Sequence, residues 1–228
     1  MSLPKEEIHR KVLHVFSGSV IPALILYIPL YATQVAWLPG WFTPRWYAPA
    51  LALCFSILFI GVDQARFRNP GLQKLFYSLS GSAMRPDEKT KMTGATYMVA
   101  AACICSFVFV GSPYISFMVL CSFIWGDAVA ALVGQSIGKI KIGKKSLEGS
   151  ASCFVLCVCL YFFVFPHVPR LLDAWNGTMP IVIGLSASLC ITLMELFPIK
   201  ISGSTVINDN LTAPVITGLL IEALRPFV

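Results

Sequence analysis

The chain has 228 residues, of which 57% are hydrophobic and 12% charged, and its formal net charge is +6. Soluble domains carry roughly 25% charged residues, so a soluble core of this size cannot bury so much apolar surface, and a disordered chain does not contain it. With a mean hydropathy of +0.76, the composition predicts an all-α integral membrane protein whose residues 1–228 form a single polytopic domain.

Seven apolar stretches approach the length of about 17–25 residues that a helix needs to cross the hydrocarbon layer. They lie at 12–32, 46–62, 93–110, 115–133, 151–166, 179–197 and 211–224. The last is short, so it either spans with little tilt, re-enters the membrane or continues toward Val228. We therefore expect a bundle of about seven transmembrane helices.

Basic residues are distributed unevenly over the connections between these stretches. Seven crossings place fourteen of the seventeen Lys and Arg residues on one side, in the N-terminal segment and in loops at about 63–92, 134–150 and 198–210. The opposite side receives Arg45, Arg170 and Arg225. Because Lys and Arg favour the cytoplasmic side, we predict a cytoplasmic N-terminus, in a prokaryotic inner membrane or the endoplasmic reticulum. No basic block with interleaved aromatic residues occurs, so membrane lipids are expected partners and nucleic acid is not.

The first long loop contains apolar residues at helical spacing, namely Leu72, Leu75, Phe76 and Leu79. This pattern predicts a short amphipathic helix, which either lies on the cytoplasmic membrane surface or packs on the end of the bundle. The eight cysteines all lie within apolar stretches, without a CxxC pair or a histidine at metal-ligand spacing. We expect them to be small packing residues.

Asp127 lies within the fourth apolar stretch, where an ionised carboxylate costs about 2.5–3.5 kcal/mol. A cation, a metal ion or a wet cavity must offset that cost. Ala130, Gly134 and Gly138 follow at helical spacing on nearly the same face. This stripe of small residues permits close approach of a ligand or, alternatively, simple helix–helix packing.

The loop after this helix is rich in lysine and glycine. Its sequence contains Gly138, Lys139, Lys141, Gly143, Lys144, Lys145, Ser146, Glu148 and Gly149. Exposed backbone amides, ammonium groups and a hydroxyl are the components of a polyphosphate site. The order is not that of a Walker A motif, because Lys145 stands where Ser or Thr is required and no strand precedes it. The alternative is an ordinary basic loop on the cytoplasmic side.

Several segments carry a resemblance to a known family. The central one is Asp127-xx-Ala130-xxx-Gly134-xxx-Gly138, then Lys144-Lys145-Ser146-Leu-Glu148-Gly149-Ser150. It resembles the signature of the CTP-dependent lipid-alcohol kinases, which include dolichol kinase, phytol kinase and CTP-dependent diacylglycerol kinase. Three further segments are similar to elements of that family, in the expected order: Arg10-Lys11-Val-Leu-His14, Lys91-Met-Thr-Gly94-Ala-Thr96-Tyr97, and Glu195 with Asn208-Asp209-Asn210-Leu-Thr-xx-Pro214.

The resemblance implies transfer of the γ-phosphate of CTP, with Mg²⁺ or another divalent cation, to the hydroxyl of a membrane lipid alcohol. On that basis Asp127, Asp209 and Glu148 are the expected metal ligands or general base. The expected nucleotide-binding residues are Arg10, Lys11, Gly134, Gly138, Lys139, Lys144, Lys145, Ser146, Gly149, Asn208 and Asn210.

The roles of His14 and Glu195 each have two possible interpretations. His14 is a candidate catalytic residue that meets either phosphate or the incoming alcohol; alternatively it is a helix-end histidine bonded to a backbone carbonyl. Glu195 either takes part in catalysis or forms an ion pair with Lys200, which lies in the loop that follows.

Two other functions are compatible with parts of the sequence. A CDP-lipid synthase also uses CTP, but the long Lys-Asp motif ending in a His-Gly-Gly triplet is not found. A small transporter explains the intramembrane acids Asp127, Glu195 and Glu222, but not the lysine-rich loop. The sequence specifies neither the alcohol, which is a polyprenol, phytol-type isoprenoid or diacylglycerol, nor an oligomeric state.

Overall fold

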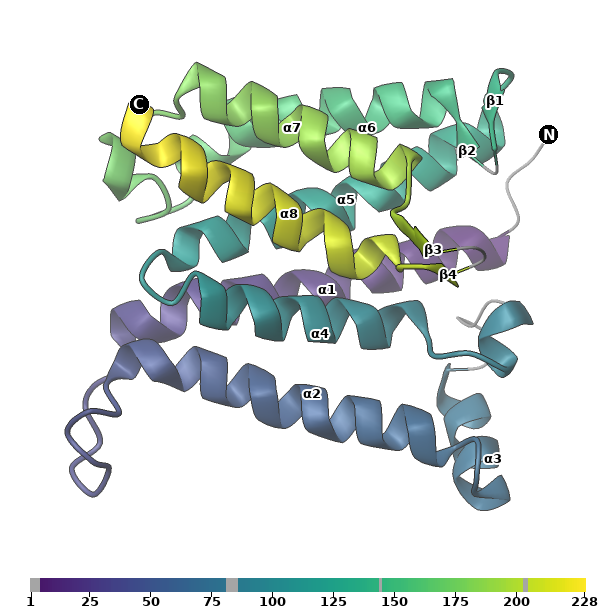
Figure 1. Cartoon of the computed structure of the whole chain (residues 1–228), viewed down its shortest axis with the longest axis horizontal. Coiled ribbons are helices and arrows are strands. Elements are labelled where there is room, and N and C mark those ends of the chain that lie inside the picture. The colour runs from purple at the N-terminus through teal and green to yellow at the C-terminus, as the bar shows by residue number, and fades with distance from the viewer. Residues whose placement is uncertain (1–4, 81–85, 144, 203–204) are drawn as a thin grey trace.

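The computed structural model describes residues 5–80, 86–143, 145–202 and 205–228. Within these residues, seven long helices run side by side along the long axis of the molecule (Figure 1). They are α1 (Lys5–Tyr31), α2 (Tyr47–Ala65), α4 (Gly94–Val108), α5 (Pro113–Ser136), α6 (Leu147–Cys159), α7 (Ile181–Leu196) and α8 (Asp209–Leu224). Each falls on one of the predicted apolar stretches, so the all-α class is confirmed.

The connections contain short elements. The helix α3 (Pro70–Ser80) follows α2, and two hairpins pair β1 (Lys141–Ile142) with β2 (Lys145–Ser146) and β3 (Lys200–Ser202) with β4 (Thr205–Val206). A π-helical segment at Leu160–Val164 continues α6, and 3-10 turns lie at Pro44–Trp46, Pro86–Lys89, Phe165–His167, Asp173–Trp175 and Arg225–Phe227. The two hairpins lie where the sequence predicts loops.

Four described segments are long and apolar enough to cross a membrane. They are Arg10–Tyr31, Pro44–Ala65, Pro113–Ser136 and Leu147–His167. The apolar helices α4 and α7 are shorter, at 15 and 16 residues, and α8 also has 16 residues. At 1.5 Å per residue such helices rise about 22–24 Å, less than the ~30 Å hydrocarbon layer. The protein is a helical membrane protein, and seven crossings remain a prediction.

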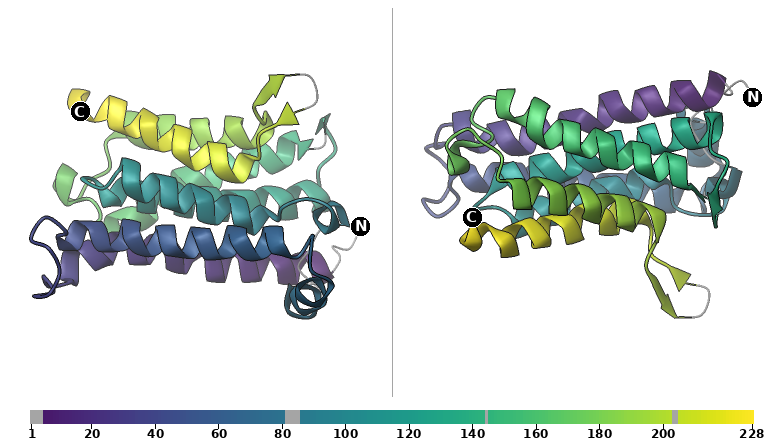
Figure 2. Two further views of the ribbon diagram at one scale, coloured as in Figure 1. Left: turned by 60° about the horizontal axis from the view of Figure 1, so that its bottom comes forward. Right: turned by 90° about the horizontal axis from the view of Figure 1, so that it is seen from above.

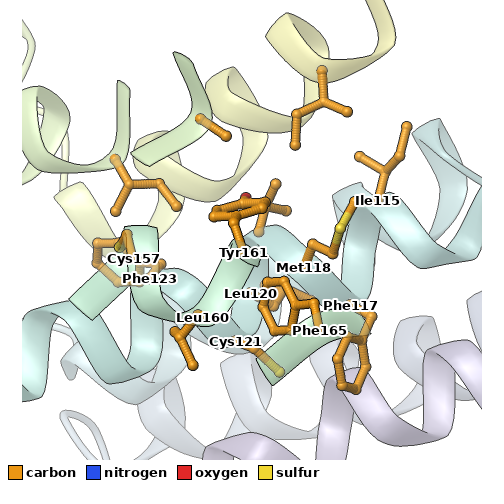
Figure 3. Packing of buried hydrophobic residues seen from close by; sticks show 14 of the residues in the cluster. Ile115, Phe117, Met118, Leu120, Cys121, Phe123, Cys157, Leu160, Tyr161 and Phe165 are labelled. Carbon is orange, nitrogen blue, oxygen red and sulfur yellow. The ribbon is translucent and has the colours of Figure 1, made fainter. Parts of the chain in front are cut away.

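Helix α5 forms the centre of the bundle, where it contacts α1, α4, α6, α7 and α8. Of its most apolar part, 56% is buried, against 24% for α1 and 22% for α2. Its side chains Met118, Leu120 and Phe123 pack with Tyr161 and neighbouring residues of the α6 extension (Figure 3). The residue before Asp127, Gly126, also faces α6. Asp127 therefore lies on the most buried of the four long apolar segments.

The eight cysteines are all unpaired, and Cys105, Cys153 and Cys157 have no exposed surface. A Cβ atom added to Gly126 would lie 2.8 Å from the sulfur of Cys153. The small side chains of Cys153 and Cys157 therefore let α5 and α6 approach closely, as predicted, whereas Cys54 is exposed.

The connections segregate to the two ends of the bundle. The start of α1, helix α3 and both hairpins lie at one end, whereas the connection from α1 to α2 and the C-terminus lie at the other (Figure 1). The hairpin β3–β4 projects beyond the helices there (Figure 2). We refer to the start of α1 and the connections after α2, α5 and α7 as the basic end. The predicted grouping of the basic loops on one side is confirmed by this arrangement.

Helix α3 confirms the predicted amphipathic helix and packs on the basic end. It runs across the direction of α2 (Figure 1), and the ring of Phe76 lies 4.8 Å from the guanidinium carbon of Arg66. Leu75 remains 55% exposed. The packed alternative therefore describes one face of α3, while Leu75 points outward from it. The side chain of Leu79 lies outside the described residues.

A buried ion pair closes the basic end of α2. Arg66 Nε donates to Asp63 Oδ1 at 2.5 Å, and neither side chain is exposed. Asp63 Oδ2 also accepts hydrogen bonds from the Thr93 amide (2.9 Å) and the Thr96 hydroxyl (2.5 Å). Arg66 Nη2 donates to the carbonyl oxygens of Glu88 and Lys91. The pair thus fixes the connection that leads into α4.

We expect Asp63→Asn to destabilise the protein by about 3–5 kcal/mol, because it leaves the Arg66 guanidinium buried without a carboxylate. Thermal unfolding in detergent, compared with Gln64→Ala at an exposed neighbouring position, measures the effect. An unchanged melting temperature for Asp63→Asn would show that water reaches Arg66.

Candidate active site

Five charged side chains from five elements meet at the basic end. Lys11 of α1 pairs with Asp127 of α5. Lys145 of β2 pairs with Glu195 of α7 at 2.7 Å and with Asp209 of α8 at 2.8 Å. The Asp127 and Glu195 carboxylates are close enough to repel each other, so the Lys11 pair and the Lys145 pairs are neighbours. We call these five residues the charged cluster.

The positions of these residues along their helices explain the convergence. Glu195 lies in the last turn of α7, and Asp209 is the first residue of α8. Asp127 lies nine residues before the end of α5, which places it about 13 Å inside that end. The β1–β2 hairpin carries Lys145 back over the ends of α7 and α8, and Lys11 reaches Asp127 from the second turn of α1.

The cluster is largely withdrawn from solvent. The side chains of Lys11 and Glu195 are 4% and 6% exposed, and Asp127 is 17% exposed. Three carboxylates face two ammonium groups in this cluster. Charges in such surroundings persist when they are paired. The arrangement therefore gathers both carboxylates and ammonium groups in one buried place.

Lys145 is more exposed than Lys11 and remains cationic. Burial lowers the pKa of Lys145, but the negative charges of Asp209 and Glu195 and the hydrogen bonds to them outweigh burial and hold that pKa above its usual 10.5. The ammonium group therefore carries its charge throughout the physiological pH range.

The predicted glycine stripe is occupied by packing between α5 and α6. Ser146 caps α6 by accepting a hydrogen bond from the Gly149 amide at 3.2 Å, and Ser146 is 4% exposed. A Cβ atom added to Gly134 would lie 2.8 Å from Ser146 Oγ, and one added to Gly138 would lie 2.5 Å from it. The contacts support the packing interpretation of these glycines. Their contact with nucleotide stays a prediction.

Gly149→Ala tests this close approach. Its Cβ atom would lie 2.6 Å from the carbonyl oxygen of Ala130, so we expect overpacking to cost about 1–3 kcal/mol. Gly61→Ala is the matched control, because nothing lies within 4 Å of its Cβ position. Melting temperatures that fall equally in both variants would contradict the expectation.

Glu148 lies apart from the two other predicted metal ligands. Its Oε1 accepts hydrogen bonds from the amides of Lys139 at 2.9 Å and Ile140 at 3.1 Å, so it holds the turn between α5 and β1. Asp127 and Asp209 instead pair with Lys11 and Lys145. Among the described residues, no group of three or more His, Cys, Asp and Glu residues forms a ready metal cage.

A divalent cation bound together with phosphate groups would need only one or two of the carboxylates. Mg²⁺ is commonly held by one or two carboxylates together with substrate phosphates and water, rather than by an all-protein cage. Asp127, Glu195 and Asp209 supply carboxylate oxygens from three facing helices, and the two lysines supply positive charge beside them.

The predicted C-terminal element shapes the start of α8. The Asn210 amide donates to Asn208 Oδ1 at 2.9 Å, which caps this helix. Asn210 Nδ2 donates to the Gly94 carbonyl at 2.8 Å, and the Gly94 amide donates to Glu88 Oε1 at 2.8 Å. Asn208 and Asn210 therefore position Asp209 and connect it with α4.

The remaining predicted residues lie around the cluster. Arg10, Lys11 and His14 follow one another within two turns of α1, and Lys139 is exposed on the loop after α5. Lys144 lies outside the described residues. The structure therefore brings Lys11, Asp127, Lys145 and Asp209 together, but not Glu148.

The sequence underestimates Glu195. Its proposed partner was Lys200, whereas the structure pairs Glu195 with Lys145, fifty positions away in sequence; the Lys200 side chain lies outside the described residues. An acidic residue in an apolar stretch was the available signal. The sequence analysis also missed the Asp63–Arg66 pair, for which the i,i+3 spacing of the two residues was the available signal.

The fold and the site define a polytopic membrane protein with a buried acid–lysine site at one end of its bundle. The chain is 31% identical over 176 residues to CTP-dependent diacylglycerol kinase 1 of Schizosaccharomyces pombe, covering 75% of this chain and 73% of that protein. The chain belongs to the family of CTP-dependent lipid kinases, which are enzymes.

Two soybean proteins support the same family. The chain is 25% identical over 228 residues to probable phytol kinase 3, chloroplastic, and 26% identical over 224 residues to probable phytol kinase 1, chloroplastic, both of Glycine max. These alignments cover 96% and 93% of this chain but 63% and 65% of the soybean proteins, so the chain spans less than two thirds of their length. No protein-family model matches the chain. No solved structure matches it either.

Proposed function

We propose that this protein transfers the γ-phosphate of CTP to the hydroxyl of a membrane lipid alcohol, with the reaction at the cytoplasmic face of the membrane. The charged cluster carries this proposal, because it places three carboxylates and two lysines on one side of the bundle. The similarity of the chain to a CTP-dependent diacylglycerol kinase and to probable phytol kinases supports both CTP as the nucleotide and a lipid alcohol as the acceptor.

In the proposed reaction the lipid oxygen forms a bond to the γ-phosphorus, and the bond from that phosphorus to the β,γ-bridging oxygen breaks. The leaving group is CDP, and the hydroxyl proton passes to a carboxylate of the cluster. Phosphoryl transfer depends mainly on alignment and neutralisation of charge. Asp127 is our candidate for the group that accepts the proton or holds the metal.

The lysines have complementary parts in this proposal. Lys145 is held over the cluster by Glu195 and Asp209, from where its ammonium group can contact the β- and γ-phosphates. Lys11 holds the Asp127 carboxylate in position. Asp127 and Asp209 would hold a divalent cation, which when bound neutralises phosphate charge. Glu148 and Ser146 shape the loop through their backbone hydrogen bonds.

Purified protein incubated with CTP or ATP and a panel of lipid alcohols tests this function. We expect a lipid monophosphate and CDP, with CTP preferred over ATP for at least one polyprenol, phytol-type alcohol or diacylglycerol. A CDP-lipid with pyrophosphate would instead identify a synthase. Equal turnover with both nucleotides across the panel would contradict the CTP preference.

We further propose that the basic end faces the cytoplasm, because it carries fourteen of the seventeen basic residues. A cysteine at the exposed position Lys141 should react with a membrane-impermeant maleimide only after the membrane is opened, in whole cells or sealed vesicles of cellular orientation. A cysteine at Arg45, at the opposite end, should react without opening. The reverse pattern would overturn both the topology and the cytoplasmic site.

A further inference from the structure

A cavity of about 550 Å³ lies between α1, α2 and α4, within the range of roughly 300–1,000 Å³ typical of ligand sites. Along α1 it extends from His14 to Ile28, a rise of about 21 Å. It therefore follows α1 through most of the apolar part of the bundle and has the length of an extended hydrocarbon chain rather than of a compact polar ligand.

The lining of this cavity is apolar except at one end. Its polar side chains are His14 and Ser17, which lie toward the basic end, and the rest of the wall consists of apolar residues and glycine. Space for a ligand arises because the facing positions Ala48, Ala52 and Ala102 carry small side chains. Such a wall suits a molecule with one polar end and a long apolar body.

The polar end of the cavity lies beside the charged cluster, whose residues are not among those lining the cavity. His14 follows Lys11 by three residues on α1, so the two side chains are neighbours on the helix surface. Lys11 in turn pairs with Asp127. A hydroxyl group at the level of His14 is therefore about one helical turn from the proposed reaction centre.

We infer that this cavity holds the hydrocarbon chain of the acceptor alcohol and that His14 stands where the hydroxyl enters. The inference rests on the proposed function and adds to it the location of the lipid and the device that limits its chain length.

A second groove, between α1 and α5, is less suited to this ligand. It is larger, at about 770 Å³, and Lys11 lies at one end of it, but all its lining residues come from α1 and α5. Trp125 Nε1 donates a hydrogen bond to Ser19 Oγ at 2.9 Å, which joins the two walls midway along the groove. The three-helix cavity is lined from α1, α2 and α4 and is the more enclosed of the two.

A substitution at the far end of the cavity tests the inference. Ala52 lies near the outer end of α2, so Ala52→Phe shortens the cavity without touching His14. We expect the ratio of kcat/KM for long-chain to short-chain primary alcohols to fall roughly fivefold or more, through steric exclusion and lost packing contacts. The short-chain rate should persist, which shows that the protein is folded.

Two control variants identify the cavity. Cys54→Phe adds the same ring two residues away, at an exposed position outside the cavity lining. Ala23→Phe instead obstructs the α1–α5 groove. Both should keep the chain-length ratio of the unmodified protein. An unchanged ratio in Ala52→Phe, or a shift in Ala23→Phe in its place, would overturn the inference.

Photolabelling decides the location independently of turnover. The probe is a long-chain alcohol with a diazirine near the end of its chain, added to protein reconstituted into bilayer discs. It should label peptides of α2 and α4. Unlabelled alcohol should suppress this labelling more than an alkane of the same length does. Labelling confined to α5, or equal suppression by alkane, would overturn the inference. Because this result requires no phosphorylation, a failure of the proposed kinase activity is distinguishable from a failure of the lipid site.

Discussion

Asp127→Asn should lower kcat per folded molecule by about two orders of magnitude or more. A positioned acid–base group is typically worth 10²–10⁴-fold in rate, and the amide keeps the shape of the side chain while removing its charge. The measurement is single-turnover and steady-state phosphorylation in detergent or bilayer discs, normalised to folded protein. Normal turnover would remove Asp127 from the mechanism.

The same substitution should also lower stability, because of a contact that the sequence did not reveal. Considered alone, a buried carboxylate is costly and its loss is favourable. The structure pairs it with Lys11, whose side chain is 4% exposed, so Asp127→Asn strands an ammonium group, at up to about 3–5 kcal/mol for a buried pair.

The double variant Lys11→Met/Asp127→Asn separates the two effects. It should recover most of the melting temperature without recovering activity. Asp173→Asn is the matched control, because Asp173 forms an exposed pair with Arg170 at the opposite end, and surface pairs contribute little. Recovery of activity in the double variant would show that neither side chain is needed for turnover and that the single variant lost activity through the unpaired Lys11 ammonium group.

Lys145→Met should lower kcat/KM for CTP by about 10²–10³, the loss usual for removal of one charge-stabilising donor. It removes the ammonium group that faces Glu195 and Asp209 and leaves those carboxylates to repel the phosphates of the nucleotide. Lys141→Met, on the exposed neighbouring strand, is the control and should change kcat/KM only a few-fold. Equal effects of the two substitutions would indicate general attraction by the basic loop instead of a specific contact.

The pH dependence of stability gives a second measurement on Lys145. Its pKa is raised in the folded protein, so its ion pairs stabilise the fold fully below the unfolded value of about 10.5 and progressively less as the pH rises through the higher folded value. The stability difference between the unmodified protein and Lys145→Met should therefore be constant near neutral pH and shrink above about pH 10.5. A difference that shrinks below neutral pH would contradict this ion-pair assignment.

The sequence was sufficient for the class of protein, the positions of the helices and the family. Apolar stretches long enough to form membrane helices are visible in composition alone, since water-free surroundings force the backbone to satisfy its hydrogen bonds within each helix. The grouping of basic loops at one end also follows from sequence, because successive antiparallel helices place alternate connections on the same side. The lysine-rich segment with Asp127 was specific enough to carry the family resemblance, which the comparisons then confirmed.

The tertiary structure decided how these residues combine. Lys145 reaches Glu195 and Asp209 because the short β1–β2 hairpin turns the chain back over the ends of α7 and α8. The spacing of residues within the loop does not predict this geometry. Gly134, Gly138 and Ser146 lie together because α5 and α6 approach closely, so the small residues are used in packing. The cavity along α1 exists because Ala48, Ala52 and Ala102, on two other helices, leave space against it. Local pattern therefore determines which segments are helices and which groups are charged, whereas long-range packing determines which charges become partners and where a cavity forms.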